Sequence, residues 1–319
     1  MNEIDRKMLV ECLTHLDSDT NVYGMCGSGK TSAIQSAINS SQYASSFGET
    51  FKKMNRMSNF PIHPVSLFEL QSGYPMSSPV DFVDELMIYG CFPEVLSKTT
   101  FSEKQKKIIN LYNNQILPSI INNESFDKTD QFKSLLNYLA KNIGELFSIS
   151  KVSRLLGLND RTTMRYLKIL QDYDIIFQIS GYKNRSPEEL TRFNKYYFTD
   201  LGVRNAIIND FSTTSTRRDT FALWENFLFS ERRKYIDYHP SGSKVSLYYW
   251  RTYSKLELCC VEAQKNDSGE EKIFSYRFSN RPVNAYLNAP RPFIESYPKT
   301  IFKNVTPKNC LEFLLCPII

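Results

Sequence analysis

The chain has 319 residues and a formal net charge of +5; apolar residues make up 41% and charged residues 23%. These values exclude a wholly disordered, a collagen-like and a low-complexity chain, and the length predicts two domains or three small ones. No uncharged apolar run approaches the roughly 18 residues of a membrane helix, and the N-terminus lacks the apolar core of a secretory signal. We therefore expect a cytoplasmic globular protein with no membrane partner.

The cysteines and histidines give no metal-ligand pattern. Seven cysteines are scattered without a CxxC pair, and the three histidines, His15, His63 and His239, lie far apart in the sequence. A disulfide framework, a zinc site and a histidine-based metal cluster are therefore not expected.

In the first half of the chain, hydrophobic periodicity predicts mostly helices. The expected elements are a helix at 3–16, a strand at 22–25, a helix at 32–38, and helices at 79–90, 103–121 and 130–146.

Residues 147–204 form a distinct unit. A helix at 150–156, a turn, a second helix at 161–173 and two β-rich runs at 175–179 and 196–198 follow one another. Helix, turn, helix and hairpin is the order of a winged helix. Asp200 is predicted to cap the helix after it.

The C-terminal part alternates helices and strands. We expect a helix at 219–233, strands at 245–250, 257–262 and 273–278, a helix at 292–297 and a last strand at 301–305.

One motif carries specific chemistry. Residues 24–31, GMCGSGKT, match GxxxxGK[ST] between an expected strand and an expected helix. The glycines let backbone N–H groups surround a phosphate, and the helix N-terminus adds positive potential. The lysine of this motif reaches the β- and γ-phosphates, and the hydroxyl of the Ser or Thr after it binds Mg²⁺. ATP with Mg²⁺ is thus the expected cofactor, and the alternative is a glycine-rich surface turn. The predicted nucleotide-binding residues are Gly24, Gly27, Ser28, Gly29, Lys30 and Thr31. Thr31 is the predicted metal ligand, and the metal that it would bind is the Mg²⁺ of the nucleotide.

The acidic residue that hydrolysis requires is missing from this segment. A phosphate-binding loop needs an acid at the end of a second strand to hold Mg²⁺ or orient water. Residues 32–80 contain no run of four apolar residues followed by Asp or Glu. Each added parallel strand also needs a crossover of a dozen or more residues, and about 28 residues separate Thr31 from Phe60. The sequence predicts a shortened nucleotide-binding sheet and weak or absent hydrolysis.

Several segments appear together in a known order: HPVSLFEL, IYGCFPEVL, YYFTDLGVRNAI, LWENFL and YYWRT. In this order they resemble a prokaryotic family of AAA+ superfamily ATPases that carries a winged helix and a restriction-nuclease-like domain of unknown function. The resemblance covers residues 60–319 and, locally, the phosphate loop. It implies an AAA+ module that has lost its middle part in this chain.

The resemblance implies a fold class of α/β plus α+β and four units. These are a truncated P-loop segment at 1–66, a helical region at 67–146, a winged helix at 147–204 and a small nuclease-like α/β domain at 205–319.

The nuclease-like unit departs from the pattern of that family. Cys259 stands where the family has Asp, and Arg277 and Ser279 stand where it has Glu and Lys. Such nucleases need these acids to hold Mg²⁺. Glu257 remains, and Glu262 lies five residues further on, on the opposite face of a strand. We expect this unit to be catalytically inactive.

The second helix of the winged-helix unit carries a basic face. Arg161, Arg165 and Lys168 lie at spacings of four and three, and Thr162 lies near the helix start. This face suits DNA phosphates, with Thr162 near the bases. Five basic and three acidic residues leave 147–178 at only +2. Binding to double-stranded DNA and binding to a protein therefore stay equally open.

Two functions from different classes remain. The first is an ATP-binding protein of AAA+ type with degenerate hydrolysis that acts on or near DNA. The second is a nucleotide-independent protein- or DNA-binding module in which the phosphate loop is a relic. The sequence decides neither the partner nor whether the chain is an enzyme.

Overall fold

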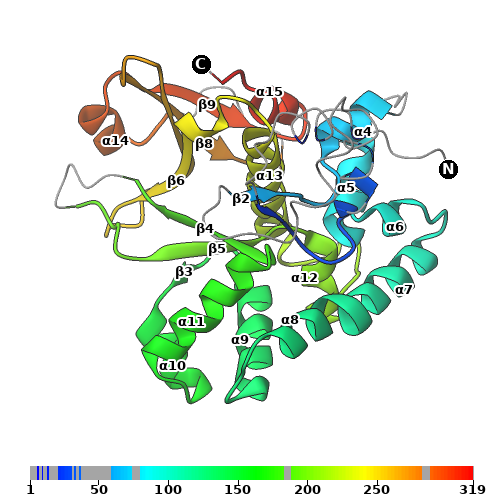
Figure 1. The fold of residues 1–319 in the computed structure, drawn as a ribbon. Coiled ribbons are helices and arrows are strands. Elements are labelled where there is room, and N and C mark those ends of the chain that lie inside the picture. The colour runs from blue at the N-terminus through cyan, green and yellow to red at the C-terminus, as the bar shows by residue number, and fades with distance from the viewer. Residues whose placement is uncertain are drawn as a thin grey trace.

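The computed structural model describes residues 6, 9, 13, 21–30, 32, 33, 36, 59–73, 80–182, 188–281 and 288–318. These residues form a mixed α/β structure (Figure 1). A two-stranded parallel sheet lies near the N-terminus, and a seven-stranded mixed sheet extends through the C-terminal half. Helices surround both sheets, so the coarse expectation of a mixed α/β fold is confirmed.

The small sheet pairs β1 (Asn21–Tyr23) with β2 (Asn59–Pro61). The pairing is parallel, and it continues past β2 where the backbone N–H of Ile62 donates to the carbonyl of Tyr23 at 2.7 Å. Helix α4 (Leu67–Gly73) follows. Both strands have three residues, and their carboxyl ends lie side by side.

A helical region comes next. It comprises α5 (Val80–Tyr89), α6 (Pro93–Leu96), α7 (Phe101–Leu111), the π-helical turn η1 (Tyr112–Ile116), α8 (Leu117–Asn123) and α9 (Thr129–Lys141). A capping box between Thr100 and Glu103 starts α7. Figure 1 shows α7 and α8 as one long helical run.

The prediction of one uninterrupted helix at 103–121 missed the π turn. In η1 the backbone N–H of Leu117 donates to the carbonyl of Tyr112, five residues earlier. Pro118 follows within the first turn of α8. Because proline has no N–H to donate, the α-helical pattern is broken at this point, and one wider turn accommodates the break.

Residues 146–198 contain a helix pair flanked by strands. The elements are β3 (Leu146–Phe147), α10 (Ile149–Leu156), α11 (Asp160–Asp172), β4 (Ile176–Gly181) and β5 (Asn194–Phe198). Strand β5 lies between β3 and β4 and is antiparallel to both. Gly157 ends α10 in the left-handed conformation, and the side chain of Asn159 accepts from the N–H of Thr162 at 2.7 Å to start α11.

The C-terminal elements complete the large sheet. They are α12 (Leu201–Ile208), α13 (Thr220–Asp237), the short 3₁₀ turn η2 (Gly242–Lys244), β6 (Val245–Arg251), β7 (Glu257–Lys265), β8 (Glu271–Phe278), α14 (Arg291–Ser296), β9 (Ile301–Val305) and α15 (Cys310–Leu314). The strand order is β3-β5-β4-β6-β7-β8-β9. The predicted cap is confirmed, since Asp200 accepts from the N–H of Val203 at 3.1 Å.

The large sheet crosses the boundary predicted at residue 204. Strands β4 and β6 pair in parallel through Ser180 with Tyr248 and Gly181 with Tyr249. Helix α13 is largely buried and lies in the centre of the molecule (Figure 1). One apolar core extends from Met25 to Leu314. The large sheet and this core therefore join the segments on both sides of residue 204.

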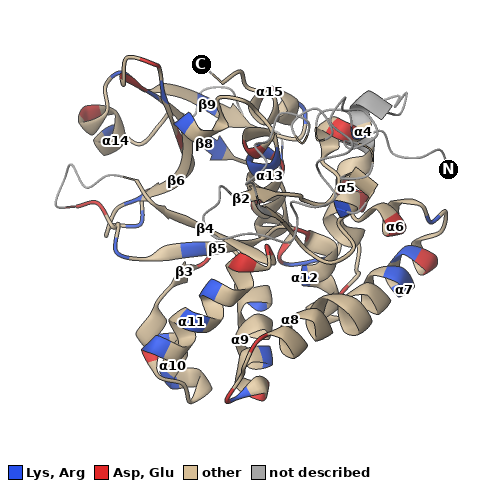
Figure 2. Cartoon of the chain, viewed as in Figure 1, with Lys and Arg blue, Asp and Glu red and all other residues tan. Residues whose placement is uncertain are grey.

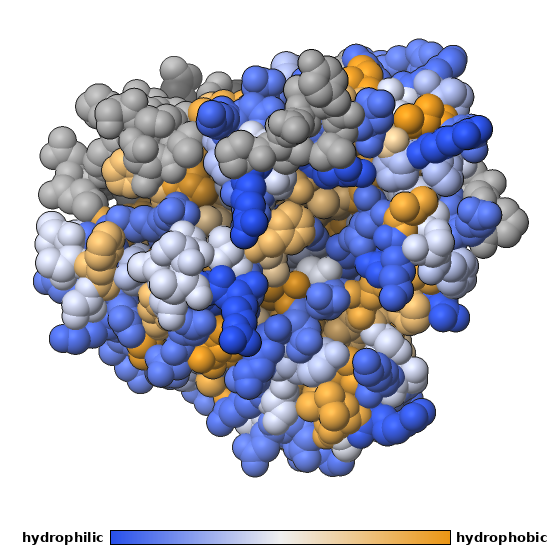
Figure 3. Space-filling model, turned by 180° about the vertical axis from the view of Figure 1, so that it is seen from behind, coloured by the Kyte–Doolittle hydropathy of each residue, from blue (hydrophilic) through white to orange (hydrophobic). Residues whose placement is uncertain are grey.

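Among the described residues, no helix combines the length and apolar character that crossing a lipid bilayer demands. Seen from behind, the surface alternates between hydrophilic and apolar side chains (Figure 3).

Candidate functional site

The segment after β1, residues 24–30, forms a tight loop that we name the glycine loop. Three of its residues have positive φ angles, Gly24 at 146°, Gly27 at 84° and Gly29 at 89°. Residues other than glycine rarely adopt positive φ angles. At Gly24 a Cβ would also lie 2.2 Å from the carbonyl oxygen of Ile62. Glycine is therefore required where the loop passes β2.

Lys30 closes the glycine loop. Its Nζ donates to the carbonyls of Gly24 at 2.6 Å and Met25 at 2.8 Å. An ammonium group has three protons, so a third donor remains beyond these two contacts within the described structure. Burial lowers the pKa of Lys30, while the nearby Cys26 and Asp174 act in the opposite direction. The loop thus carries a partly buried cation over its own backbone.

A helix begins directly after this loop. The N–H of Ala33 donates to the carbonyl of Gly29 at 3.0 Å. The exposed N–H groups of a helix start favour anions. Thr31, predicted to hold Mg²⁺, lies outside the described residues.

Arg6 anchors the far side of the loop. Its guanidinium donates to the carbonyl of Ser28 at 2.9 Å and to the carboxylate of Glu69 at 2.7 Å. The same guanidinium reaches the carbonyl of His63 at 3.0 Å. Ser28 Oγ is fully buried and has no hydrogen-bond partner among the described residues. An unpaired buried hydroxyl costs free energy, so it marks a position suited to a polar ligand.

The helical region forms one wall of the glycine loop. A Cβ on Gly27 would lie 2.9 Å from the Leu111 side chain, and one on Gly29 would lie 3.6 Å from Pro93. The Cys26 thiol donates to Gln115 Oε1 at 3.8 Å. Gln115 lies in the π turn η1, so this turn borders the loop.

A buried charged network lies at the end of β2. His63 Nδ1 is 2.7 Å from Asp174 Oδ2, and His63 Nε2 is 2.8 Å from Asp237 Oδ2. Arg233 donates to Asp174 at 2.8 Å, and the hydroxyl of Thr199 donates to it at 3.2 Å. Two carboxylates therefore face two cations, and the network joins β2, the turn after α11, and α13.

The charges in this network reinforce one another. Burial alone would raise the pKa of Asp174, but Arg233 and His63 outweigh it and bring that pKa to about 2. Burial also acts to lower the pKa of His63, yet the charge of Asp174 and the hydrogen bonds with Asp174 and Asp237 raise it above its ordinary value. The carboxylate of Asp174 is thus ionised, and both carboxylates are occupied by protein partners.

The charged network adjoins the glycine loop. His63 directly follows Ile62, whose carbonyl contacts Gly24. Burial raises the pKa of Tyr23, the residue before Gly24. The charge of Arg233 acts to lower this pKa, and the charge of Asp174 acts to raise it. Histidine, not an acid, therefore stands at the carboxyl end of the strand beside β1, and it is linked to carboxylates from remote segments.

The predicted DNA-contacting residues lie on one helix, α11. Arg161 is exposed, and Thr162 is half-buried near the helix start. Arg165 donates to the carbonyl of Ser125, and Lys168 pairs with Asp172. Figure 2 shows basic residues on α10 and α11. The four residues thus lie on one helix, and two of them already have intramolecular partners.

The C-terminal acid Glu257 is held by cations. Lys195 donates to it at 2.6 Å and to Glu225 at 3.2 Å, and Arg251 also pairs with it. Burial raises the pKa of the neighbouring Cys259 thiol to about 12. The ammonium of Lys195 thus lies between the two carboxylates, and the guanidinium of Arg251 adds a second positive charge at Glu257. Glu262 pairs instead with Arg232.

Arg277 and Ser279 add no acid to this group. The neighbour of Arg277, Tyr276, pairs with Cys260 across β7 and β8. Ser279 lies just beyond the end of β8, where its hydroxyl donates to the carbonyl of Arg281. No group of three or more His, Cys, Asp or Glu residues in the described part of the chain is arranged to hold a metal ion. Nuclease inactivity stays a prediction.

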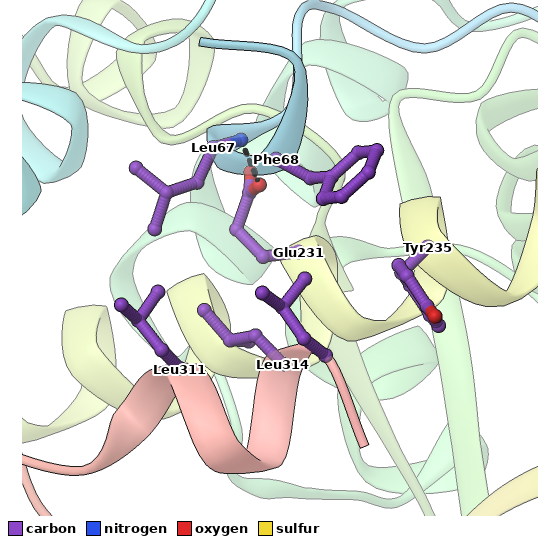
Figure 4. Close-up of a pocket in the computed structure, with 7 residues that line it drawn as sticks. Leu67, Phe68, Glu231, Tyr235, Leu311 and Leu314 are labelled. Carbon is purple, nitrogen blue, oxygen red and sulfur yellow. Dashed lines mark hydrogen bonds between the residues drawn. The ribbon is translucent and has the colours of Figure 1, made fainter. Parts of the chain in front are cut away.

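A small hollow lies between α4, α13 and α15 (Figure 4). It is lined by Leu67, Phe68, Glu231, Tyr235, Leu311, Leu314 and Leu315. Its charged residue, Glu231, accepts from the N–H of Leu67 at 2.6 Å and from Lys234 at 2.6 Å. The carboxylate is thereby occupied, and the hollow is otherwise mainly apolar.

Sequence reasoning missed the residues that surround the glycine loop. Arg6, His63, Asp174, Arg233 and Gln115 come from five separate segments. His63 lies in one of the stretches that carried the resemblance, but no spacing rule connects it with the others. Only the folded chain brings these side chains together.

Comparison with known proteins gives similarity without an assigned activity. A family model described as a Domain of unknown function (DUF8612) matches residues 81–214. An uncharacterized protein of Haemophilus influenzae is 27% identical over 195 residues, 57% of this chain and 47% of that relative. The uncharacterized proteins Mb2031c of Mycobacterium bovis and Rv2008c of Mycobacterium tuberculosis are each 29% identical over 122 residues, 38% of this chain and 26% of their own length. No solved structure matches. The matched part thus spans about half of the first relative and about a quarter of the other two.

Proposed function

We propose that this chain binds the phosphates of ATP, with Mg²⁺, at the glycine loop. The observation that carries the proposal is the position of Lys30, whose ammonium lies over the carbonyls of Gly24 and Met25 with one proton left for an anion. Three glycines with positive φ give the loop its tight curvature, and a helix start follows. The buried hydroxyl of Ser28 adds a polar group without a described partner.

The proposal includes weak or absent hydrolysis. ATP hydrolysis needs a carboxylate that is available to Mg²⁺ or to the attacking water. The carboxylate of Asp174 near the loop is instead occupied by His63, Arg233 and Thr199. Binding without efficient turnover is the behaviour that these contacts favour. Thr31 would ligate the Mg²⁺ that accompanies the nucleotide.

We further propose descent from the AAA+ type of ATPase, with a winged helix at 147–204 and an inactive nuclease-like unit at 205–319. The order β3, α10, α11, β4, β5, with β5 paired to both other strands, supports the winged helix. The parallel pairing of β1 and β2 on either side of the glycine loop supports a remnant nucleotide-binding sheet. A cytoplasmic location fits ATP binding and fits the described cysteines, which form no disulfide.

Calorimetry with Mg·ATP tests the proposal. Wild type should bind ATP, and Lys30→Ala should lose at least about tenfold in affinity, because a charge-assisted contact to phosphate is removed. Lys141→Ala is the matched control, since Lys141 is exposed at the end of α9. Turnover is then measured on the same samples. Equal or undetectable binding by wild type and Lys30→Ala would identify the loop as a relic and favour the nucleotide-independent module.

A second candidate function is binding of double-stranded DNA by α11. The exposed Arg161 and Arg154 favour it, and so do the Lys and Arg residues that Figure 2 marks on α10 and α11. Met164 and Leu155 are also exposed there, 48% and 65%, which suits a protein partner. The salt dependence of DNA retention separates the two partners, since phosphate contacts release counterions. A steep loss of binding with salt supports DNA, and absence of retention at low salt leaves a protein partner.

A further inference from the structure

We infer that Gln115, in the π turn η1, is a phosphate-contacting residue of the glycine loop. The inference rests on the proposed function and names a side chain from outside the loop that contacts the nucleotide. Its starting point is the contact between the Cys26 thiol and Gln115 Oε1 at 3.8 Å.

This contact places Gln115 at the part of the loop that also holds the cation. Cys26 directly follows Met25, whose carbonyl accepts from Lys30 Nζ at 2.8 Å. Lys30 in turn lies over the first two carbonyls of the loop. The lysine of such a loop reaches the β- and γ-phosphates, so a group that borders Cys26 lies near the terminal phosphates.

The carboxamide of Gln115 has the chemistry that this position needs. It carries two N–H donors in addition to the oxygen that accepts from Cys26. Gln115 is half-buried, whereas Asn113 and Asn114 in the same turn are exposed. Rotation of the amide about its terminal bond would direct the N–H donors toward an anion in the loop, without movement of the backbone.

The π turn itself is a second observation. Its wider ring forms where Pro118 interrupts the helix, and it faces the loop beside Leu111, which contacts Gly27. Single π turns within helices occur frequently at functional sites. A helical irregularity thus lies against the loop, and Gln115 is part of it.

Charge substitutions at Gln115 test the inference. Gln115→Glu should weaken ATP binding by about tenfold, and Gln115→Lys should tighten it severalfold, because one variant repels phosphate and the other attracts it. A residue with a purely structural role would weaken binding in both variants. Asn113→Glu and Asn113→Lys are matched controls, since they make the same charge changes on the exposed side of the turn and should change affinity less than about twofold.

The measurement is calorimetric titration with Mg·ATP after the folding of each variant is checked by its melting temperature. The inference is supported if Glu and Lys at position 115 change the affinity for Mg·ATP in opposite directions while the two variants at position 113 leave it unchanged. Changes in the same direction, or no change, while wild-type binding still depends on Lys30, overturn the inference and leave the proposed function standing. If wild type does not bind ATP, or Lys30→Ala binds it equally well, the proposed function fails, and the inference fails with it.

Discussion

At the scale of single residues, Gly24 shows how closely two strands can approach. Its missing side chain leaves room for the carbonyl of Ile62, and this contact brings the glycine loop against the end of β2. The positive φ angle at the same residue adds a conformational requirement. Space and backbone conformation therefore both demand glycine.

We predict that Gly24→Ala destabilises the protein by about 3 kcal/mol, through a clash added to left-handed strain. Gly269→Ala is the control, because its φ is also positive, 79°, and its Cβ would meet nothing within 4 Å. The control should lose only about 1–2 kcal/mol. Urea unfolding of both variants measures the difference. Equal losses of unfolding free energy would show that the contact with Ile62 does not add to the cost of Gly24→Ala.

His63 makes the stability depend on pH. Its pKa is raised in the folded chain, so it contributes stability that is fully present below the unfolded value of about 6.5 and is lost as pH rises through the folded value. His63→Gln should remove this dependence and, below pH ~6, cost about 3 kcal/mol, since buried charges lose their partner.

Unfolding free energies of wild type and His63→Gln, measured from pH 6 to pH 9, check this prediction. His239→Gln is the control, because burial lowers the pKa of His239 and so gives a dependence of opposite sign. Identical pH profiles for wild type and His63→Gln would mean that His63 is neutral in the folded chain.

At the scale of elements, most helices and strands were predictable. The helices expected at 79–90, 130–146 and 219–233 correspond to α5, α9 and α13 within a few residues. Their periodic apolar faces reflect burial on one side, which a short window of sequence records. The π turn η1 and the strand β2 were missed, because one depends on a broken hydrogen-bond pattern and the other on a distant partner.

Helix α11 carries a prediction for DNA binding. Arg161 is exposed, and no described contact occupies its guanidinium, whereas Arg165 and Lys168 have partners. Arg161→Ala should therefore weaken DNA binding across sequences and lower the slope of log affinity against log salt by about 1. Lys299→Ala, on the exposed turn after α14, should leave the slope unchanged. Fluorescence anisotropy at several salt concentrations measures both, and equal slopes would exclude Arg161 from the interface.

At the scale of the whole molecule, the large sheet joins segments that sequence reasoning separated. The pairing of β4 with β6 and the apolar core around α13 couple the helix pair to the C-terminal strands. The two tryptophans report on different parts, since Trp224 lies in the main core and Trp250 lies in the smaller cluster with Phe293. Both are fully buried.

We predict a single cooperative unfolding transition that both tryptophans report. Trp250→Phe leaves Trp224 as the sole fluorescent tryptophan, and Trp224→Phe leaves Trp250. In each variant, the midpoint of fluorescence should coincide with that of far-ultraviolet circular dichroism, because the shared sheet couples the two regions. Two separated midpoints in either variant would show that the region around Trp250 unfolds independently.

The sequence by itself determined the local features of this protein. It located the glycine loop, the lysine at its end, most helices and strands, and the basic face of α11, because each depends on residues that are neighbours along the chain or around one helix. Tertiary structure alone decided that His63 meets Asp174 and Asp237, that Gln115 borders Cys26, and that β4 joins β6. These contacts connect residues up to 174 positions apart, and no local periodicity encodes such pairings.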